Sequence, residues 1–303
     1  MPFDVLAPLG SRLRLTFLGQ PTGVPAWETA LEDGDDAGFF APDSAVWAVH
    51  GRMATIPGGI RALLTQTLHP GVLAGVVEHS DYRRDPLARL AGTIRWIFTV
   101  TYGDMAAARR ACAWVRGRHR PVEGEYVSAR GAYEHYSAND PVLAAWVHLA
   151  FTDAFLRTYE AFVGPVPGGA DRYVAEWAVA GELMGVADPP RSDAALRARL
   201  EAYDADGQLG GGPRVEEVVA FLRRPPLDPM LRPGYAILFN AVLESMPARH
   251  LALLGLQRPH LGPVPLPVRA AAKATLAVVG RALDPMLPAE AAARRRLARL
   301  GAL

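Results

Sequence analysis

Two polar residues four positions apart interrupt a strongly apolar segment, and their types are suited to chemistry. The segment is "PLARLAGTIRWIFTVTYG" (86–103), and Arg89 and Thr93 share one face of the helix that its spacing predicts. This helix is apolar around most of its circumference, which indicates burial. A buried guanidinium needs an acceptor, because an unpaired charge away from water costs several kcal/mol. Arg89 therefore either pairs with a nearby carboxylate, such as Asp85 or Glu78, or holds a ligand.

A histidine among arginines follows in "AWVRGRHRPVEGE" (113–125). The basic neighbours of His119 are Arg116, Arg118 and Arg120. At helical spacing His119 falls on the same stripe as Cys112 and Val115, so it continues an apolar face. Such a histidine is either a core residue bonded to a backbone carbonyl or a metal ligand aimed inward.

His148 has a similar setting in "DPVLAAWVHLAFTDAFLRTYEAFVG" (140–164), where it shares a stripe with Thr152 and Phe155. Taken alone, each of these histidines is most simply a member of a satisfied core network. No two histidines have the i, i+4 spacing of a helical metal site, and Walker, HExxH and GxSxG motifs are missing. Cys112 is the only cysteine, which excludes disulfides and thiolate zinc sites.

Composition excludes several classes of protein. The 303 residues carry a formal net charge of +1, which gives no support for nucleic-acid binding. Lys273 is the only lysine, so a lysine mechanism is excluded from most of the chain. We find no secretory signal and no run of about 18 uncharged apolar residues. We therefore expect no membrane span and a cytoplasmic location.

The pattern is helical nearly throughout and contains no convincing strands. Asp85-Pro86 and Asp140-Pro141 are typical helix starts, because Asp accepts free amides and Pro needs no amide partner there. Helices are predicted over about 58–69, 70–80, 86–102, 104–119, 141–162, 170–185, 193–205, 214–223, 233–246, 247–255, 267–283 and 288–300. We expect a loop over 120–139 and an irregular arm over 1–42. The prediction is one all-α domain over 43–303.

Five blocks, met in order along the chain, resemble a known family. They are "DSAVWAVHGRMATIPGGIRALLTQTLHPGVLAGVVEHSDYRRDPLARLAGT" (43–93), "GRHRPVEG" (117–124), "YSANDPVLAAWVH" (136–148), "YEAFVGPV" (159–166) and "GELMGV" (181–186). The sequence is similar there to the family that includes latex clearing protein and the MpaB-type oxygenases. The similarity covers about 43–187 and is diffuse beyond 190.

The resemblance implies a helical, loosely globin-like fold around a pocket for haem b, whose iron is held by one histidine. By motif, His119 is similar to that iron ligand. Arg89 and Thr93 match the Arg-xxx-Thr pair beside the haem and are candidate catalytic residues. Arg116 and Arg120 are candidates for pairing with haem propionates, as is Arg89, because Arg forks bind carboxylates well. His148 is a further candidate for contact with the cofactor.

One departure affects the function that the resemblance implies. Some rubber oxygenases carry a lysine between the Arg and the Thr, and this chain has Gly92 there. The distal side of the haem is then open, bound by water, or closed by another residue such as His69 or His79. Glu78 is the candidate for the acidic base of those enzymes.

The resemblance thus implies a haem-dependent oxygenase or oxidase that uses O2 or peroxide on a small apolar or natural-product substrate, with no electron donor assigned. The alternative is a helical protein that binds haem or an apolar ligand without turnover.

Overall fold

Aspartate side chains begin the helices that carry the site in the computed structural model. Helix α6 (Pro86–Tyr102) starts where Asp85 accepts the amide of Ala88 at 3.1 Å. Helix α7 (Met105–His119) starts at Asp104 in the same way, and α8 (Pro141–Phe162) starts at Asp140. Each carboxylate satisfies an amide that has no partner within the helix. The two predicted Asp-Pro helix starts are confirmed.

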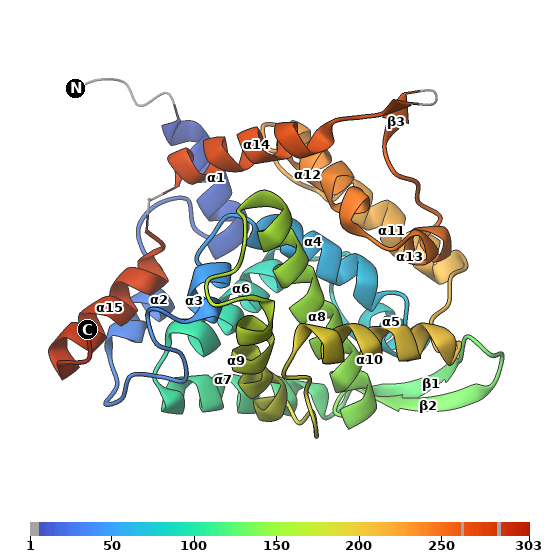
Figure 1. The fold of residues 1–303 in the computed structure, drawn as a ribbon, viewed down its shortest axis with the longest axis horizontal. Helices are drawn as coiled ribbons and strands as arrows, with labels where there is room; N and C mark the ends of the chain where they lie inside the picture. Colours follow the sequence, from blue (N-terminus) through green and yellow to red (C-terminus); the bar gives the residue numbers. More distant parts are fainter. Residues whose placement is uncertain (1–5, 262–263, 284–285) are drawn as a thin grey trace.

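The structure describes residues 6–261, 264–283 and 286–303 (Figure 1). The other helices in these ranges are α1 (Ala7–Leu18), α2 (Ala26–Thr29), the short 3-10 helix η1 (Ala30–Glu32), α3 (Ala45–His50), α4 (Thr55–Gln66), α5 (Pro70–His79), α9 (Ala170–Leu183), α10 (Asp193–Ala205), α11 (Pro213–Arg223), α12 (Arg232–Ser245), α13 (Ala248–Leu253), α14 (Val268–Ala282) and α15 (Pro288–Leu300). The predicted mostly helical single domain is confirmed.

A β-hairpin occupies the segment where we expected a loop, so that expectation was wrong. Strands β1 (Glu123–Val127) and β2 (Tyr133–Ser137) pair antiparallel, with Glu123 opposite Ser137. The hairpin projects beside α5 and α10 in Figure 1. Most of its side chains are exposed, so the sequence lacks the apolar alternation of a half-buried strand. A second, two-residue pairing joins β3 (His260–Leu261) to β4 (Val264–Pro265).

The predicted irregular arm over 1–42 contains helix α1, whose close packing depends on a glycine. Helix α1 lies beside α14 in Figure 1. A Cβ at Gly10 would lie 2.4 Å from the carbonyl oxygen of Ala282, so only glycine allows this approach. The helix ends at Gly19, which has a left-handed φ of 76°. The long-range contact with α14 is the part that local sequence does not reveal.

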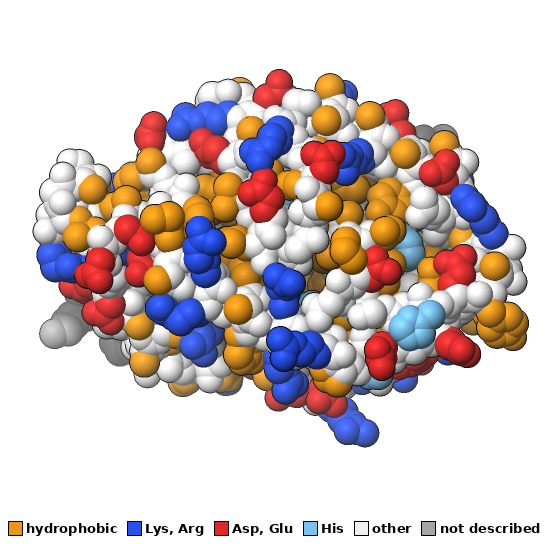
Figure 2. All heavy atoms as spheres, turned by 90° about the horizontal axis from the view of Figure 1, so that it is seen from below, with side chains coloured by type: hydrophobic (Ala, Val, Ile, Leu, Met, Phe, Trp, Pro, Cys, Tyr) orange, Lys and Arg blue, Asp and Glu red, His pale blue; other side chains and the backbone are white. Residues whose placement is uncertain are grey.

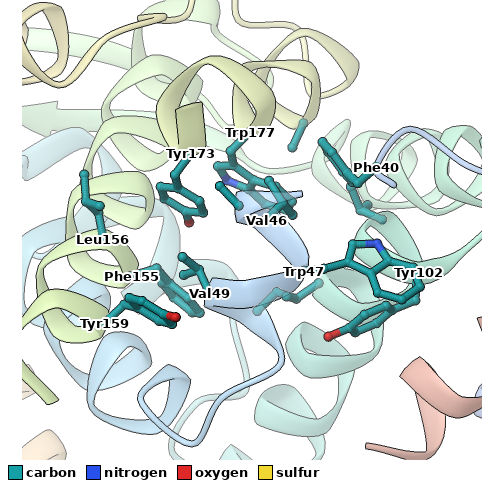
Figure 3. Close-up of a cluster of buried hydrophobic side chains, with 14 of the residues drawn as sticks. Phe40, Val46, Trp47, Val49, Tyr102, Phe155, Leu156, Tyr159, Tyr173 and Trp177 are labelled. Atoms are coloured by element: carbon teal, nitrogen blue, oxygen red, sulfur yellow. The ribbon is translucent and has the colours of Figure 1, made fainter. Parts of the chain in front are cut away.

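The largest aromatic cluster fills the space between α3, α6, α8 and α9. Figure 3 shows the rings of Trp47 and Tyr102 side by side, with centroids 4.9 Å apart. At its centre His50 is fully buried, with ring nitrogens 2.8 Å from the Thr101 hydroxyl and 3.1 Å from the Tyr173 hydroxyl. Both nitrogens are thus satisfied, and His50 has a structural role.

A buried arginine fastens the C-terminal helix to the rest of the domain. Arg296 on α15 is fully buried, and its guanidinium donates to backbone carbonyls rather than to a carboxylate. The acceptors are Leu31 at 2.6 Å, Tyr102 at 2.8 Å and Ala37 at 3.5 Å. One side chain therefore connects α15 with η1, the loop after it and the end of α6.

Replacing this arginine tests the connection. Arg296→Met keeps the apolar stem but leaves buried carbonyls without donors, so we expect a loss of about 2–4 kcal/mol in the free energy of unfolding. Arg299→Met is the matched control on the same helix, because Arg299 also binds carbonyls but is exposed. Its loss should stay below about 1 kcal/mol. Denaturant titration measures both, and equal losses would contradict the role of Arg296.

Candidate functional site

A cavity of about 1400 Å³ runs through the helical part of the molecule. Its wall is mostly aliphatic and aromatic, and most of it is formed by residues of α1, α4, α5, α6, α7, α8, α9, α11, α12 and α14. Ligand pockets for drug-sized molecules are roughly 300–1000 Å³. The cavity thus has room for a large ligand or for two. Charged side chains of both signs are interspersed on the face seen in Figure 2.

His119 stands in the cavity wall, half-buried, at the last position of α7. Burial lowers the pKa of its imidazole, a hydrogen bond with the backbone of Ala138 acts in the opposite direction, and the positive charge of Arg89 lowers the pKa further. The ring is therefore neutral at neutral pH, and a second hydrogen-bond partner for it is missing from the described residues. A neutral imidazole with one nitrogen fixed and one nitrogen free is suited to metal ligation.

The turn that follows α7 brings the backbone of Ala138 close to His119. The amide of Val122 donates to the carbonyl of His119 at 3.0 Å, which turns the chain beyond Pro121. The amide of Ala138 then donates to the carbonyl of Val122 at 2.8 Å, next to the end of β2. The hairpin that we had predicted as a loop thus holds Ala138 beside the imidazole.

Arg89 lies in the same wall without a carboxylate partner among the residues that the structure describes. Its guanidinium donates to the hydroxyl of Ser80, and burial lowers its pKa while Tyr82 acts in the opposite direction. The two carboxylates considered from the sequence are engaged elsewhere. Asp85 caps α6, and Glu78 pairs with Arg214 at 3.1 Å. The structure therefore does not support the ion-pair explanation of Arg89.

The next turn of α6 leaves space at the wall. Thr93 lines the cavity, but its hydroxyl donates to the carbonyl of Arg89 at 3.0 Å, so its proton is already engaged. A Cβ placed on Gly92 would meet no atom within 4 Å. The wall is thus open at Gly92.

His148 is buried in the wall on α8, and its Nε2 has no hydrogen-bond partner in the described part of the chain. Burial lowers the pKa of His148 to about 4. Its ring lies close against Gly181, where a Cβ would be 3.0 Å from two ring atoms. The absence of a side chain at 181 therefore leaves room for the His148 ring, whose Nε2 is buried without a hydrogen-bond partner among the described residues.

The remaining predicted site residues lie apart from this group. Glu78 is outside the lining and accepts a hydrogen bond from the Tyr136 hydroxyl at 2.7 Å. Arg116 and Arg120 are exposed and also outside the lining. Their proposed roles, and that of Glu78 as a base, stay predictions. Of the possible distal residues, His69 caps α5 through the amide of Gly71 and His79 lines the cavity.

Two lining residues were missed by the sequence analysis. Arg118, next to the predicted ligand, lines the cavity although Arg116 and Arg120 do not. Only the exact rotation of the last turn of α7 decides which arginine faces inward. Glu28 also lines the cavity, from helix α2 in the N-terminal segment. Nothing in the local sequence distinguishes it from the exposed acidic residues that follow.

The described side chains are too few to hold a metal ion by themselves, so a metal here would need a bound group that supplies most of its ligands. Within the described ranges, His, Cys, Asp and Glu residues form no cluster of three that could hold a metal ion. No described helix is long and apolar enough to cross a bilayer. Together these features describe a helical domain with a large, mostly apolar cavity whose wall contains His79, His119 and His148, and with Arg89 there lacking a described carboxylate partner.

The model of the family described as "ER-bound oxygenase mpaB/B'/Rubber oxygenase, catalytic domain" matches residues 47–282. The chain belongs to this family of oxygenase catalytic domains, which confirms the resemblance seen in the sequence. A comparison with curated proteins gives no match, and neither does a comparison with solved structures.

The low pKa of His148 predicts how stability depends on pH. An unfolded histidine binds a proton below about 6.5, whereas folded His148 stays neutral down to about 4. The contribution of His148 to the free energy of unfolding is therefore intact above pH 6.5 and decreases as the pH falls from about 6.5 to about 4. Between pH 7.5 and 5 this residue accounts for a loss of about 2 kcal/mol.

We expect His148→Gln to reduce the fall in the free energy of unfolding between these two pH values by about that amount. The control is His135→Gln, because His135 is exposed on the hairpin and should leave the pH dependence unchanged. Denaturant titrations at both pH values measure the difference. A variant that retains the wild-type pH dependence would show that His148 is not held neutral.

Proposed function

We propose that this chain is a haem b-dependent oxygenase or oxidase that acts on a small apolar or natural-product substrate with O2 or peroxide. The observation that carries the proposal is a neutral imidazole, His119, in the wall of an apolar cavity in an oxygenase-family domain. Because no cluster of three His, Cys, Asp or Glu residues in the described ranges could hold a metal ion, a porphyrin that supplies four nitrogen ligands of its own fits the donor set.

The residues present fit this group in three respects. The cavity volume of about 1400 Å³ exceeds that of an ordinary ligand pocket. Gly92 leaves an open region on α6, where no side chain obstructs the approach of a macrocycle. Arg89 has a guanidinium without a carboxylate partner among the described residues, and haem carries anionic propionates. Haem, when bound, supplies the oxygen-activating redox chemistry.

The chain's own residues then have definable tasks. His119 would hold the iron through its free nitrogen, and Ala138 would fix the orientation of the ring through the other. Arg89 would counter negative charge, either on a propionate or on the oxidant during reaction. His148 would accept or donate a hydrogen bond through its unpaired Nε2. The apolar wall would exclude water and admit an apolar substrate.

The second candidate is a protein that binds haem or another apolar ligand without turnover. It is favoured by the positions of Thr93 and Glu78, since the Thr93 proton is engaged with Arg89 and Glu78 lies outside the cavity. Two of the three residues proposed for catalysis thus need to move before they can act. Turnover assays with O2 or peroxide distinguish the two functions.

An absorption spectrum of the purified chain, with a pyridine haemochrome assay, tests haem binding. We expect a Soret band and the haem b haemochrome, and His119→Ala should abolish the band or weaken haemin affinity by at least about tenfold. His135→Ala is the control, because that histidine is exposed and outside the cavity lining. A colourless protein that takes up no haemin, or equal binding by both variants, would contradict the proposal.

Filling the open region on α6 provides an independent test. Gly92→Phe should leave the melting temperature unchanged or raised, because Gly is a poor helix former and the site has space. Haemin uptake should nevertheless fall, since the new phenyl ring fills the open space beside α6. Gly117→Phe is the control, because Gly117 also has open space around it but lies outside the lining. Undiminished haemin uptake by Gly92→Phe would place the cofactor elsewhere.

A further inference from the structure

Glu28 is a carboxyl group buried in the cavity wall without a partner. The residue is 1 % exposed and lines the cavity from α2. Its Oε2 has no hydrogen-bond partner, and no described residue forms an ion pair with it. Burial alone raises the pKa of Glu28 to about 7. It lies outside the segment matched by the family, so family membership assigns it no role.

An unpaired buried carboxyl group is costly, and proteins retain such groups mainly where a ligand compensates them. Leaving a buried polar group unsatisfied forfeits its interaction with water and replaces it with nothing. No described residue donates a hydrogen bond to Oε2 of Glu28, and the cavity wall as a whole is mostly aliphatic and aromatic. A donor would therefore have to come from whatever occupies the cavity.

The position of Glu28 indicates the length of such an occupant. The ring of Trp27, the preceding residue, lies 6.5 Å from the ring of Phe98, in the last part of α6. Arg89 stands nine residues earlier on the same helix, and both Arg89 and Phe98 line the cavity. At a rise of about 1.5 Å per residue, Arg89 and Phe98 are about 13 Å apart along the axis of α6. The wall between them is mostly apolar.

The chemistry of the group indicates the ligand's polar end. Near neutral pH the carboxyl group exists in both its protonated and its ionised form, so it can donate as well as accept. A hydroxyl group also donates and accepts, and one carboxyl satisfies both functions. An ammonium group has three donors and no acceptor, and the two oxygens of Glu28 would leave at least one of the three donors without a partner.

We propose that Glu28 anchors the hydroxyl group of an elongated, otherwise apolar substrate, with the reacting part of the chain directed toward the His119 and Arg89 end of the cavity. This inference deepens the proposed function, and its substrate orientation rests on that function. The hydroxyl preference of Glu28 does not depend on haem, so it can be measured separately.

Binding of matched probes tests the anchor. Decanol and its isomer methyl nonyl ether have the same atoms, but only decanol carries a hydroxyl donor. Trp96 and Trp177 line the cavity, so a change in the intensity or wavelength of tryptophan emission reports binding. We expect the chain without haem to bind decanol about tenfold more tightly than the ether, the effect of one net hydrogen bond to a buried group.

Three variants identify the origin of this preference. Glu28→Leu should bind both probes equally and keep its affinity for the ether, and it should fold, because it removes an uncompensated polar group. Glu28→Gln should retain most of the preference, since an amide can also donate and accept. Glu216→Leu, which removes an exposed carboxylate outside the lining, should behave as wild type. Melting temperatures verify that each variant is folded.

The outcomes separate this inference from the haem proposal. Any of three results would overturn the hydroxyl anchor. They are equal binding of decanol and the ether by the wild type, a preference for decanol that survives in Glu28→Leu, and tighter binding of decylamine than of decanol. Such a result in a chain that binds haemin through His119 leaves the proposed function intact. A preference that depends on Glu28 in a chain that takes up no haemin supports the anchor and overturns the haem proposal alone.

Discussion

The charge of Arg89 in the wall of an apolar cavity is the constraint on which the site depends. A guanidinium away from water is tolerated only when acceptors surround it, and Arg89 has the Ser80 hydroxyl but no described carboxylate. The two acidic candidates that the sequence suggests are used elsewhere, Asp85 as a helix cap and Glu78 in a pair with Arg214. The cavity is therefore prepared for a ligand that carries negative charge, and the same charge helps to keep His119 neutral.

The fold holds this arrangement by connecting distant parts of the chain. Helix α6 presents Arg89, Gly92 and Thr93 to the cavity, and the start of α6 is fixed by its aspartate cap. Helix α7 ends at His119, where the turn through Val122 brings Ala138 against the imidazole. On the opposite helix α8, His148 can approach only because residue 181 is glycine. The backbone of Ala138 thus acts on the His119 ring, while Nε2 of His148 has no hydrogen-bond partner among the described residues.

Much of this could be predicted from the sequence, because the helix starts, the apolar stripes and the family's motif blocks are local patterns. The structure brings Arg89, Thr93, His119 and His148, which these patterns single out, into the wall of one cavity, while their roles stay predictions. The hairpin was missed because its exposed side chains carry no apolar alternation, and α1 because its stability comes from contact with α14. The choice of Arg118 over its neighbours, and the burial of Glu28, depend on tertiary packing that local spacing does not encode.

The central claim is that one imidazole holds a haem iron inside this cavity. A crystal structure of the chain loaded with haemin tests it most directly, because the cavity contains two candidate histidines, His119 and His148, with a free ring nitrogen. The account predicts the iron within bonding distance of a His119 nitrogen, with the macrocycle against α6. Iron bound to His148 instead, or haem on the outer surface of the protein, would contradict it.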